Sequence, residues 1–175
     1  PVTGLTATST SSSQINLSWD ANNGADSYIL KRATSSNGPF TAVANNLNGT
    51  SHSDTELTSN QQYFYIISAL QAGIEGPESA AVSATTSIAA PTNLRATASG
   101  GNTINLTWNA SPGATAYRIQ RSTTSGGPYT PITAVSGMTS YSNTELTAGT
   151  TYYYIIEAIK GAELSLPSAE ASAMP

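Results

Sequence analysis

The 175 residues carry a net charge of −4, charge on only 9% of positions and no cysteine. This composition excludes disulfides and thiolate zinc sites, and it lacks the basic patch that nucleic acid binding requires. No apolar run approaches the roughly 20 residues of a membrane-spanning helix.

The sequence repeats at a spacing of 89 residues. The segment Ile15–Trp19 (INLSW) returns as Ile104–Trp108 (INLTW), and about two in five aligned positions are identical without an insertion. Two copies of this length predict tandem globular domains rather than a solenoid, whose periods are roughly 20–50 residues. We therefore expect a domain at residues 1–86, a short extended linker at residues 87–90 and a second domain at residues 91–175. Because the chain opens on Pro1, without an initiator methionine or a signal peptide, we also expect it to be a segment of a longer protein.

Within each repeat, apolar and polar residues alternate over short runs, which is typical of strands with one buried face. Turn signals rich in Asn, Gly and Pro, such as Asn22–Gly24 and Ser35–Pro39, separate these runs. No window shows a helical stripe. The pattern predicts strands at residues 3–9, 14–19, 27–33, 40–44, 50–54, 62–70 and 78–84, and again 89 residues later. Strands at this spacing predict an all-β chain of two consecutive seven-stranded antiparallel sandwiches.

Aromatic residues mark equivalent points of both repeats. A tryptophan ends the second expected strand, a tyrosine opens the third, and a Leu-x5-Tyr-x-Tyr-x-Ile-x-Ala motif leads through the sixth. The positions are Trp19, Tyr28, Leu57 and Tyr63, and then Trp108, Tyr117, Leu146 and Tyr152. Together they resemble the fibronectin type III family, which implies an immunoglobulin-like sandwich with these eight residues in its structural core. The resemblance also implies that Tyr63 and Tyr152 are tyrosine corners, whose hydroxyls bond backbone near Leu57 and Leu146.

The two tryptophans admit a second interpretation, because indole faces also stack on sugar rings. Trp19 alternates with polar residues in step with Ile15 and Leu17, however, and Trp108 repeats the pattern. This alternation favours the core for both.

The outer face of the sixth strand is the one place where the sequence suggests a contact surface. Its alternation places apolar and aromatic side chains away from the core, beside outward residues of the third strand. The expected surface positions are Ile29, Phe64, Ile66, Arg118, Tyr153 and Ile155. Three interpretations stay open: cross-strand packing that only shields the backbone, contact with a flanking domain, or polysaccharide binding.

No residue set predicts catalysis, cofactor binding or a metal site. The single histidine, His52, is matched by Tyr141 in the second repeat, which favours an aromatic packing position. The acidic turn Asp20–Asp26 has the wrong spacing for a calcium loop, and the second repeat carries no carboxylate there. We therefore expect a protein that is not an enzyme and that holds no cofactor.

The Gly-Pro-Phe/Tyr turns at Gly38–Phe40 and Gly127–Tyr129 and the Thr-Ser-x-Ser-x-Thr-Glu-Leu segments at Thr50–Leu57 and Thr139–Leu146 further resemble bacterial fibronectin type III domains. Such domains occur in secreted carbohydrate-active enzymes and surface proteins. The resemblance implies a monomeric, non-catalytic spacer that presents modules within a larger secreted or cell-surface bacterial protein, in the first place a carbohydrate-active enzyme. Its partners would be flanking domains of the same polypeptide, with neither nucleic acid nor membrane insertion. The alternative is a binding module for polysaccharide or surface adhesion, through the outer face around Phe64 and Tyr153.

Overall fold

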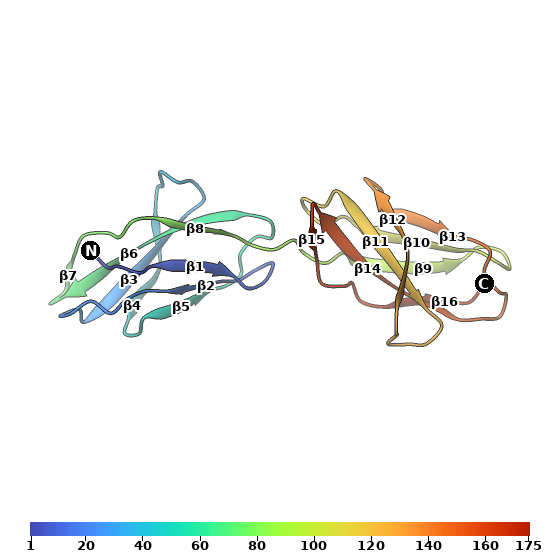
Figure 1. Ribbon diagram of the computed structural model, residues 1–175, viewed down its shortest axis with the longest axis horizontal. Helices are drawn as coiled ribbons and strands as arrows, with labels where there is room; N and C mark the ends of the chain where they lie inside the picture. Colours follow the sequence, from blue (N-terminus) through green and yellow to red (C-terminus); the bar gives the residue numbers. More distant parts are fainter. The chain divides into compact units, whose positions relative to one another are not determined.

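A computed structural model describes the whole chain, residues 1–175. The chain forms two compact units, Pro1–Ser87 and Ile88–Pro175, which we call the first and second domains (Figure 1). Both consist of strands and turns only, so no helix is present that could cross a membrane.

The first domain is a sandwich of two antiparallel sheets. The smaller sheet has the order β1-β2-β5, with β1 at Thr6–Ser9, β2 at Ile15–Ser18 and β5 at Ser51–Asp54. The larger sheet has the order β4-β3-β6-β7, and β8 also pairs with β6. Its strands are β3 (Ser27–Ala33), β4 (Thr41–Leu47), β6 (Gln62–Gln71), β7 (Ile74–Glu75) and β8 (Val82–Thr85).

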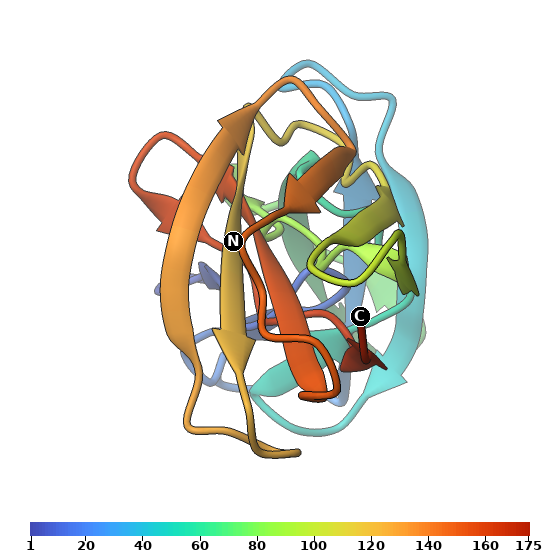
Figure 2. The same ribbon diagram turned by 90° about the vertical axis from the view of Figure 1, so that its right-hand side faces the viewer.

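The second domain repeats this topology. Its smaller sheet has the order β13-β10-β9, formed by β9 (Thr92–Ala98), β10 (Ile104–Asn109) and β13 (Ser140–Asn143). The larger sheet has the order β12-β11-β14-β15, with β16 also on β14, and Figure 2 shows this domain end-on. Its strands are β11 (Ala116–Ser122), β12 (Thr130–Ser136), β14 (Tyr152–Lys160), β15 (Glu163–Leu164) and β16 (Ala171–Ala173).

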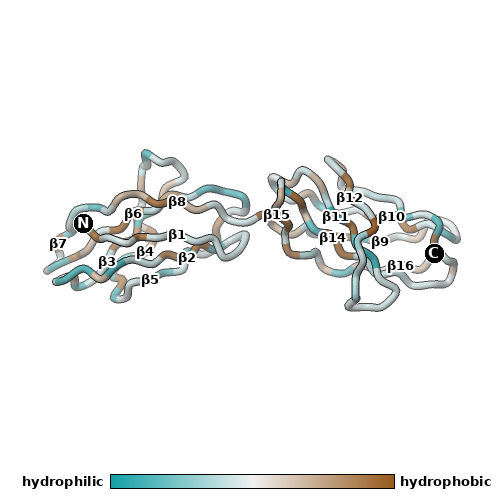
Figure 3. The backbone as a smooth tube through the Cα atoms, viewed as in Figure 1, coloured by the Kyte–Doolittle hydropathy of each residue, from teal (hydrophilic) through white to brown (hydrophobic).

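Each domain has its own apolar core between its two sheets, because alternate residues of every long strand point inward. Apolar colour in Figure 3 is concentrated along strands such as β14, whereas most turns are hydrophilic. The first core comprises Val2, Ile15, Leu17, Trp19, Tyr28, Leu30, Leu57, Tyr63, Tyr65 and Ile67. The second comprises Ile88, Ile104, Leu106, Trp108, Tyr117, Ile119, Val135, Leu146, Tyr152, Tyr154, Ile156 and Ala158.

The last strand of each sandwich differs from the sequence expectation of one strand at 78–84. In the first domain it is divided into β7 and β8. A tight turn, with Ala72 at φ 49° and Gly73 at φ 77°, folds β7 back onto the end of β6. Between β7 and β8, the Ser79 hydroxyl accepts a hydrogen bond of 3.0 Å from the backbone N–H of Ile67. A side-chain hydrogen bond thus replaces a backbone–backbone bond between the strands.

The boundary between the domains lies between Ser87 and Ile88, inside the stretch 87–90 that the sequence suggests as a linker. The Ser87 N–H donates to the Ser11 carbonyl oxygen over 3.1 Å, within the first domain. Ile88 is only 3% exposed in the second core, and its N–H donates to the Glu163 carboxylate over 2.8 Å. Burying the aliphatic side chain of Ile88 in the core lowers the free energy relative to leaving it exposed in a linker. The second domain therefore starts three residues earlier than expected.

Candidate functional site

The tyrosine corners tie the start of each long strand to the turn before it. The Tyr63 hydroxyl accepts a hydrogen bond of 3.0 Å from the Thr58 N–H, and the Tyr152 hydroxyl accepts one of 3.1 Å from the Thr147 N–H. Both rings are buried, and an arginine guanidinium lies over each ring at 5.3 and 5.1 Å from the centroid. The corners therefore fix the turn and the strand as one unit.

Replacing Tyr63 with phenylalanine is expected to lower the free energy of unfolding of the first domain by about 1–3 kcal/mol, because the part-buried Thr58 N–H loses its acceptor. Urea unfolding measures the effect. Tyr153→Phe is the matched control, since that half-buried tyrosine lies on the outer face of β14. If Tyr63→Phe had the same midpoint as the unmodified chain, the hydroxyl would not hold the corner.

Trp19 and Trp108 lie inside the sandwiches. Each packs edge-on against the tyrosine that opens the next strand, with ring centroids 5.5 Å apart for Trp19 and Tyr28 and 5.4 Å apart for Trp108 and Tyr117. Each tyrosine hydroxyl accepts a backbone N–H over 2.8 Å. Because both indoles are buried, neither presents a face to a sugar ring.

A buried polar centre, which sequence reasoning missed, joins the two sheets of each domain. In the first domain the Asp54 carboxylate accepts bonds of 2.9 and 2.8 Å from Arg32 Nη1 and one of 2.8 Å from the Tyr65 hydroxyl. Asp54 comes from β5, whereas Arg32 and Tyr65 come from β3 and β6 of the other sheet. The only signal in the sequence is the polar residue just before each Thr-Glu-Leu corner.

The second domain builds the same centre around a neutral amide. Asn143 Oδ1 accepts a bond of 3.0 Å from Arg121 Nη1 and one of 2.9 Å from the Tyr154 hydroxyl. The two domains thus offer a matched pair, with a carboxylate in one and an amide of the same shape in the other.

Burial changes the acidity of the tyrosines in these centres. It raises the pKa of Tyr154 to about 12. In the first domain, burial followed by the hydrogen bond to Asp54 raises the pKa of Tyr65 further still. Both phenols therefore stay protonated in the folded domains well above the pH at which a free tyrosine ionises.

We expect the chain to lose stability as the pH rises from 10 towards 12. An unfolded tyrosine releases its proton near a pKa of about 10, so above this pH the unfolded chain binds fewer protons than the folded one and the free energy of unfolding falls. Urea midpoints at pH 9, 10 and 11, read from Trp108 fluorescence in a Trp19→Phe background, measure this loss in the second domain. Tyr154→Phe should flatten the decline, and an unchanged slope would contradict the assignment.

The outer sheet faces are less open than the sequence predicts. Most of the expected surface positions are half-buried, namely Ile29, Phe64, Arg118, Tyr153 and Ile155. The remaining one, Ile66, is only 4% exposed.

Ile66 is covered because an ion cluster crosses the outer face of the first domain. Lys31 is its cross-strand partner, and the Lys31 ammonium lies 2.7 Å from both Glu75 and Glu78. The two carboxylates hold the lysine stem over the sheet, where its methylenes shield apolar neighbours. The expectation that Ile66 offers an exposed contact is therefore wrong: alternation gives the correct side of the strand but not what covers that side.

Hydrogen bonds within this cluster shift the acidity of its members in opposite directions. Those to Glu75 and then Glu78 raise the pKa of Lys31, and the bond from Lys31, followed by that from Ser68, lowers the pKa of Glu75. The cluster thus favours its charged form.

The outer face of the second domain is also occupied by polar groups. Glu157 accepts bonds from Arg118 Nε over 2.7 Å and from Gln120 Nε2 over 2.8 Å. Register places Ile155 beside Gln120 and Tyr153 beside Ser122, so the cross-strand partners of both residues on β11 are polar. The equivalent outer faces of the two domains therefore carry different sets of polar side chains.

Glu170, just before β16, fastens the turn between β11 and β12 in the second domain. Its carboxylate accepts hydrogen bonds from the Ser125 hydroxyl over 2.9 Å, from the Gly126 N–H over 2.8 Å and from the Tyr129 hydroxyl. The equivalent residue of the first domain is Ala81. The corresponding turn there has no such clamp.

The remaining candidates lie apart from one another. His52 pairs with Leu17 in register, as Tyr141 pairs with Leu106 in the other domain. In the acidic turn, Asp20 accepts the Thr3 hydroxyl over 3.0 Å, whereas Asp26 accepts the Ala72 N–H over 2.7 Å. No group of three or more His, Cys, Asp or Glu side chains is placed to hold a metal ion.

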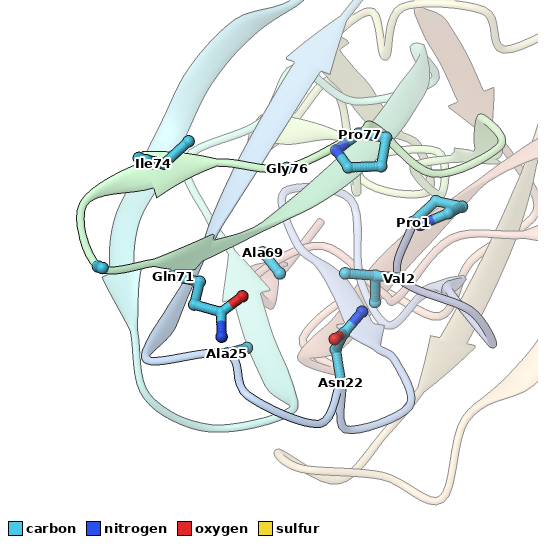
Figure 4. Close-up of a pocket in the computed structure, with 10 residues that line it drawn as sticks. Pro1, Val2, Asn22, Ala25, Ala69, Gln71, Ile74, Gly76 and Pro77 are labelled. Carbon is cyan, nitrogen blue, oxygen red and sulfur yellow. The ribbon is translucent and has the colours of Figure 1, made fainter.

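A pocket of about 450 Å³ lies at one end of the first domain, between the start of the chain and the β6–β7 hairpin. Figure 4 shows Val2 and Ala69 pointing towards each other across it, with Asn22 and Gln71 at its polar margin. The pocket is mostly apolar and holds no titratable side chain, so it is suited to an apolar group rather than to chemistry.

Known proteins resemble this chain at three levels. The fibronectin type III domain profile matches residues 1–85 and 89–173. Two curated amylopullulanases are similar over part of it: that of Thermoanaerobacterium saccharolyticum is 41% identical over 69 residues, and that of Thermoanaerobacterium thermosulfurigenes is 40% identical over 70. These regions cover 39% and 40% of the chain but only 5% and 4% of those enzymes.

Among solved structures, a two-domain fibronectin type III segment of chicken tenascin aligns over 99% of both chains, with a TM-score of 0.60 and 19% identity. A fibronectin type III-like protein from Clostridium thermocellum is 50% identical, covering 49% of this chain and 90% of its own, with a TM-score of 0.46. The tenascin segment shows the same fold, and the profile covers nearly every residue. The chain therefore belongs to the fibronectin type III family, of which it carries two consecutive domains.

Proposed function

We propose that this chain is a non-catalytic spacer within a larger secreted bacterial carbohydrate-active enzyme, where it holds flanking modules at a set separation. Two observations support the enzyme context: the chain belongs to a family of modular domains, and parts of it are similar to segments of two proteins named amylopullulanase. Fold alone does not define a role, so the proposal depends on how the two domains are connected.

The connection carries the proposal. Consecutive residues, Ser87 and Ile88, are each bonded into their own domain through their backbone N–H groups. No run of unbonded Gly or Ser separates them, and such runs are what make a linker flexible. A spacer needs this property, because a flexible tether would not set a separation.

Spin labels at matched positions test the proposal in the intact chain. Thr8 and Thr97 are exposed and equivalent, and the chain has no cysteine, so Thr8→Cys with Thr97→Cys places exactly one label in each domain. We expect a single narrow distribution of distances between the labels. The matched control inserts eight Gly and Ser residues between Ser87 and Ile88 and should broaden it. Distance distributions of equal width in the two chains would contradict the spacer function.

The competing function, polysaccharide binding at the outer faces, is less favoured because ion pairs and half-buried side chains occupy those faces. Affinity electrophoresis in soluble glucans, xylans and chitin derivatives tests it. If a polysaccharide retards the unmodified chain but not the chain with Phe64→Ala and Tyr153→Ala, the outer faces bind that polysaccharide. This result would favour a binding module over a spacer. Unretarded migration in every gel supports the spacer.

A further inference from the structure

The pocket of the first domain corresponds to a region of the second domain that belongs to its apolar core. With the spacing of 89 residues, the pocket residues Ala25 and Ala69 correspond to Ala114 and Ala158. Both counterparts belong to, or pack against, the core cluster that contains Ile88. Ile88 therefore belongs to the same core cluster as the counterparts of two pocket residues.

Equivalent positions around this region differ in burial between the two domains. Ala158 is fully buried, whereas its counterpart Ala69 is half-buried. The polar margin shows the same change, because Ser111 is buried and its counterpart Asn22 is half-buried. The first domain thus has more exposed residues at these positions, and its sequence has no residue equivalent to Ile88.

We propose that this pocket is a docking slot for a branched aliphatic side chain, carried two positions ahead of Pro1 on an extended polypeptide segment that leads into the first domain. Ile88 has this position relative to Ala90, the counterpart of Pro1. Val2 and Ala69 belong to the apolar lining of the pocket, whose volume is about 450 Å³. The proposal goes beyond the spacer function and does not depend on it.

The second domain also shows which additional contact would strengthen docking. There the Glu163 carboxylate accepts the N–H of Ile88 over 2.8 Å. The counterpart of Glu163 is Ile74, which is 73% exposed and has no side-chain acceptor. The first domain therefore offers the apolar slot without this hydrogen bond.

The test extends the full chain by Ile-Ala ahead of Pro1, which copies Ile88 and Ala89, and compares it with a Ser-Ala extension of equal length. A Trp108→Phe background leaves Trp19 to report the first domain alone. We expect the Ile-Ala chain to have an equilibrium constant of unfolding about tenfold lower, the net result of burying an aliphatic side chain and ordering two residues. Methyl contacts between the added isoleucine and Ala69 should appear by nuclear Overhauser spectroscopy.

Equal stability of the two extended chains, without methyl contacts, would overturn the proposal. A gain that grows with protein concentration, together with dimers in sedimentation, would assign the slot to a second copy and would also overturn it. Ile74→Glu supplies an independent check on chains that remain folded. It should add a further severalfold stabilisation in the Ile-Ala chain and little in the Ser-Ala chain, and an equal effect in both would contradict docking along this backbone path.

Discussion

Replacing Trp19 with alanine is expected to lower the free energy of unfolding of the first domain by about 3–5 kcal/mol, the usual effect of deleting a large buried aromatic side chain. Trp19 fills the space between the sheets and packs edge-on against Tyr28 at 5.5 Å. The loss combines the burial of the indole, the ring contact and the cavity that remains. For a domain of this size, such a loss is a large part of the total stability.

The second domain supplies the control for this experiment. Trp19→Ala leaves Trp108 as the only tryptophan, so fluorescence then follows the second domain while circular dichroism follows both. We expect the fluorescence transition to stay in place while an earlier transition appears by circular dichroism. A single unshifted transition by both methods would contradict the structural role of Trp19.

Removing the arginine of the buried centre should have unequal effects in the two domains. Arg32→Met leaves the Asp54 carboxylate buried without its cation and should cost about 2–4 kcal/mol, below the full range for a buried pair because the Arg32 side chain is 30% exposed. Arg121→Met leaves only the neutral Asn143 and should cost about 0.5–1.5 kcal/mol. Methionine keeps the apolar stem, so the comparison isolates the head group.

A second substitution shows whether the charge of Asp54 causes this difference. Asp54→Asn in the Arg32→Met chain converts the first centre into that of the second domain and should restore most of the lost stability. Urea unfolding with the Trp19 and Trp108 reporters separated, as above, measures both domains. Failure of the amide to rescue the first domain would mean that Arg32 acts through its contact with the Tyr63 ring instead.

The sequence predicts most of the framework because its signals are local. Alternation over β2 and β6 is enough to choose the face of Trp19 or Tyr65, and the turn residues between strands are strong conformational signals. The corner tyrosines are also local, since Tyr63 bonds Thr58 only five residues away.

The features that the sequence does not predict depend on contacts between distant segments. Asp54 meets Arg32 across the sandwich, and the buried position of a carboxylate at a strand end has no periodic signature. Ile66 is on the expected side of β6, but its cover comes from Lys31, Glu75 and Glu78, which pair only in the folded sheet. Ile88 is buried in the second core, and its N–H bonds the carboxylate of Glu163, 75 residues further along.

The clamp formed by Glu170 has a consequence for proteolysis. A protease binds an extended, unbonded stretch of several residues, which exposed turns provide more readily than strands. The carboxylate of Glu170 restrains the turn at Ser125 and Gly126, whereas the first domain has Ala81 in its place and lacks this restraint. Limited digestion should therefore cut the first domain near Ser35–Pro39 before it cuts the second, and the two halves of the repeat would differ in lifetime despite their common fold.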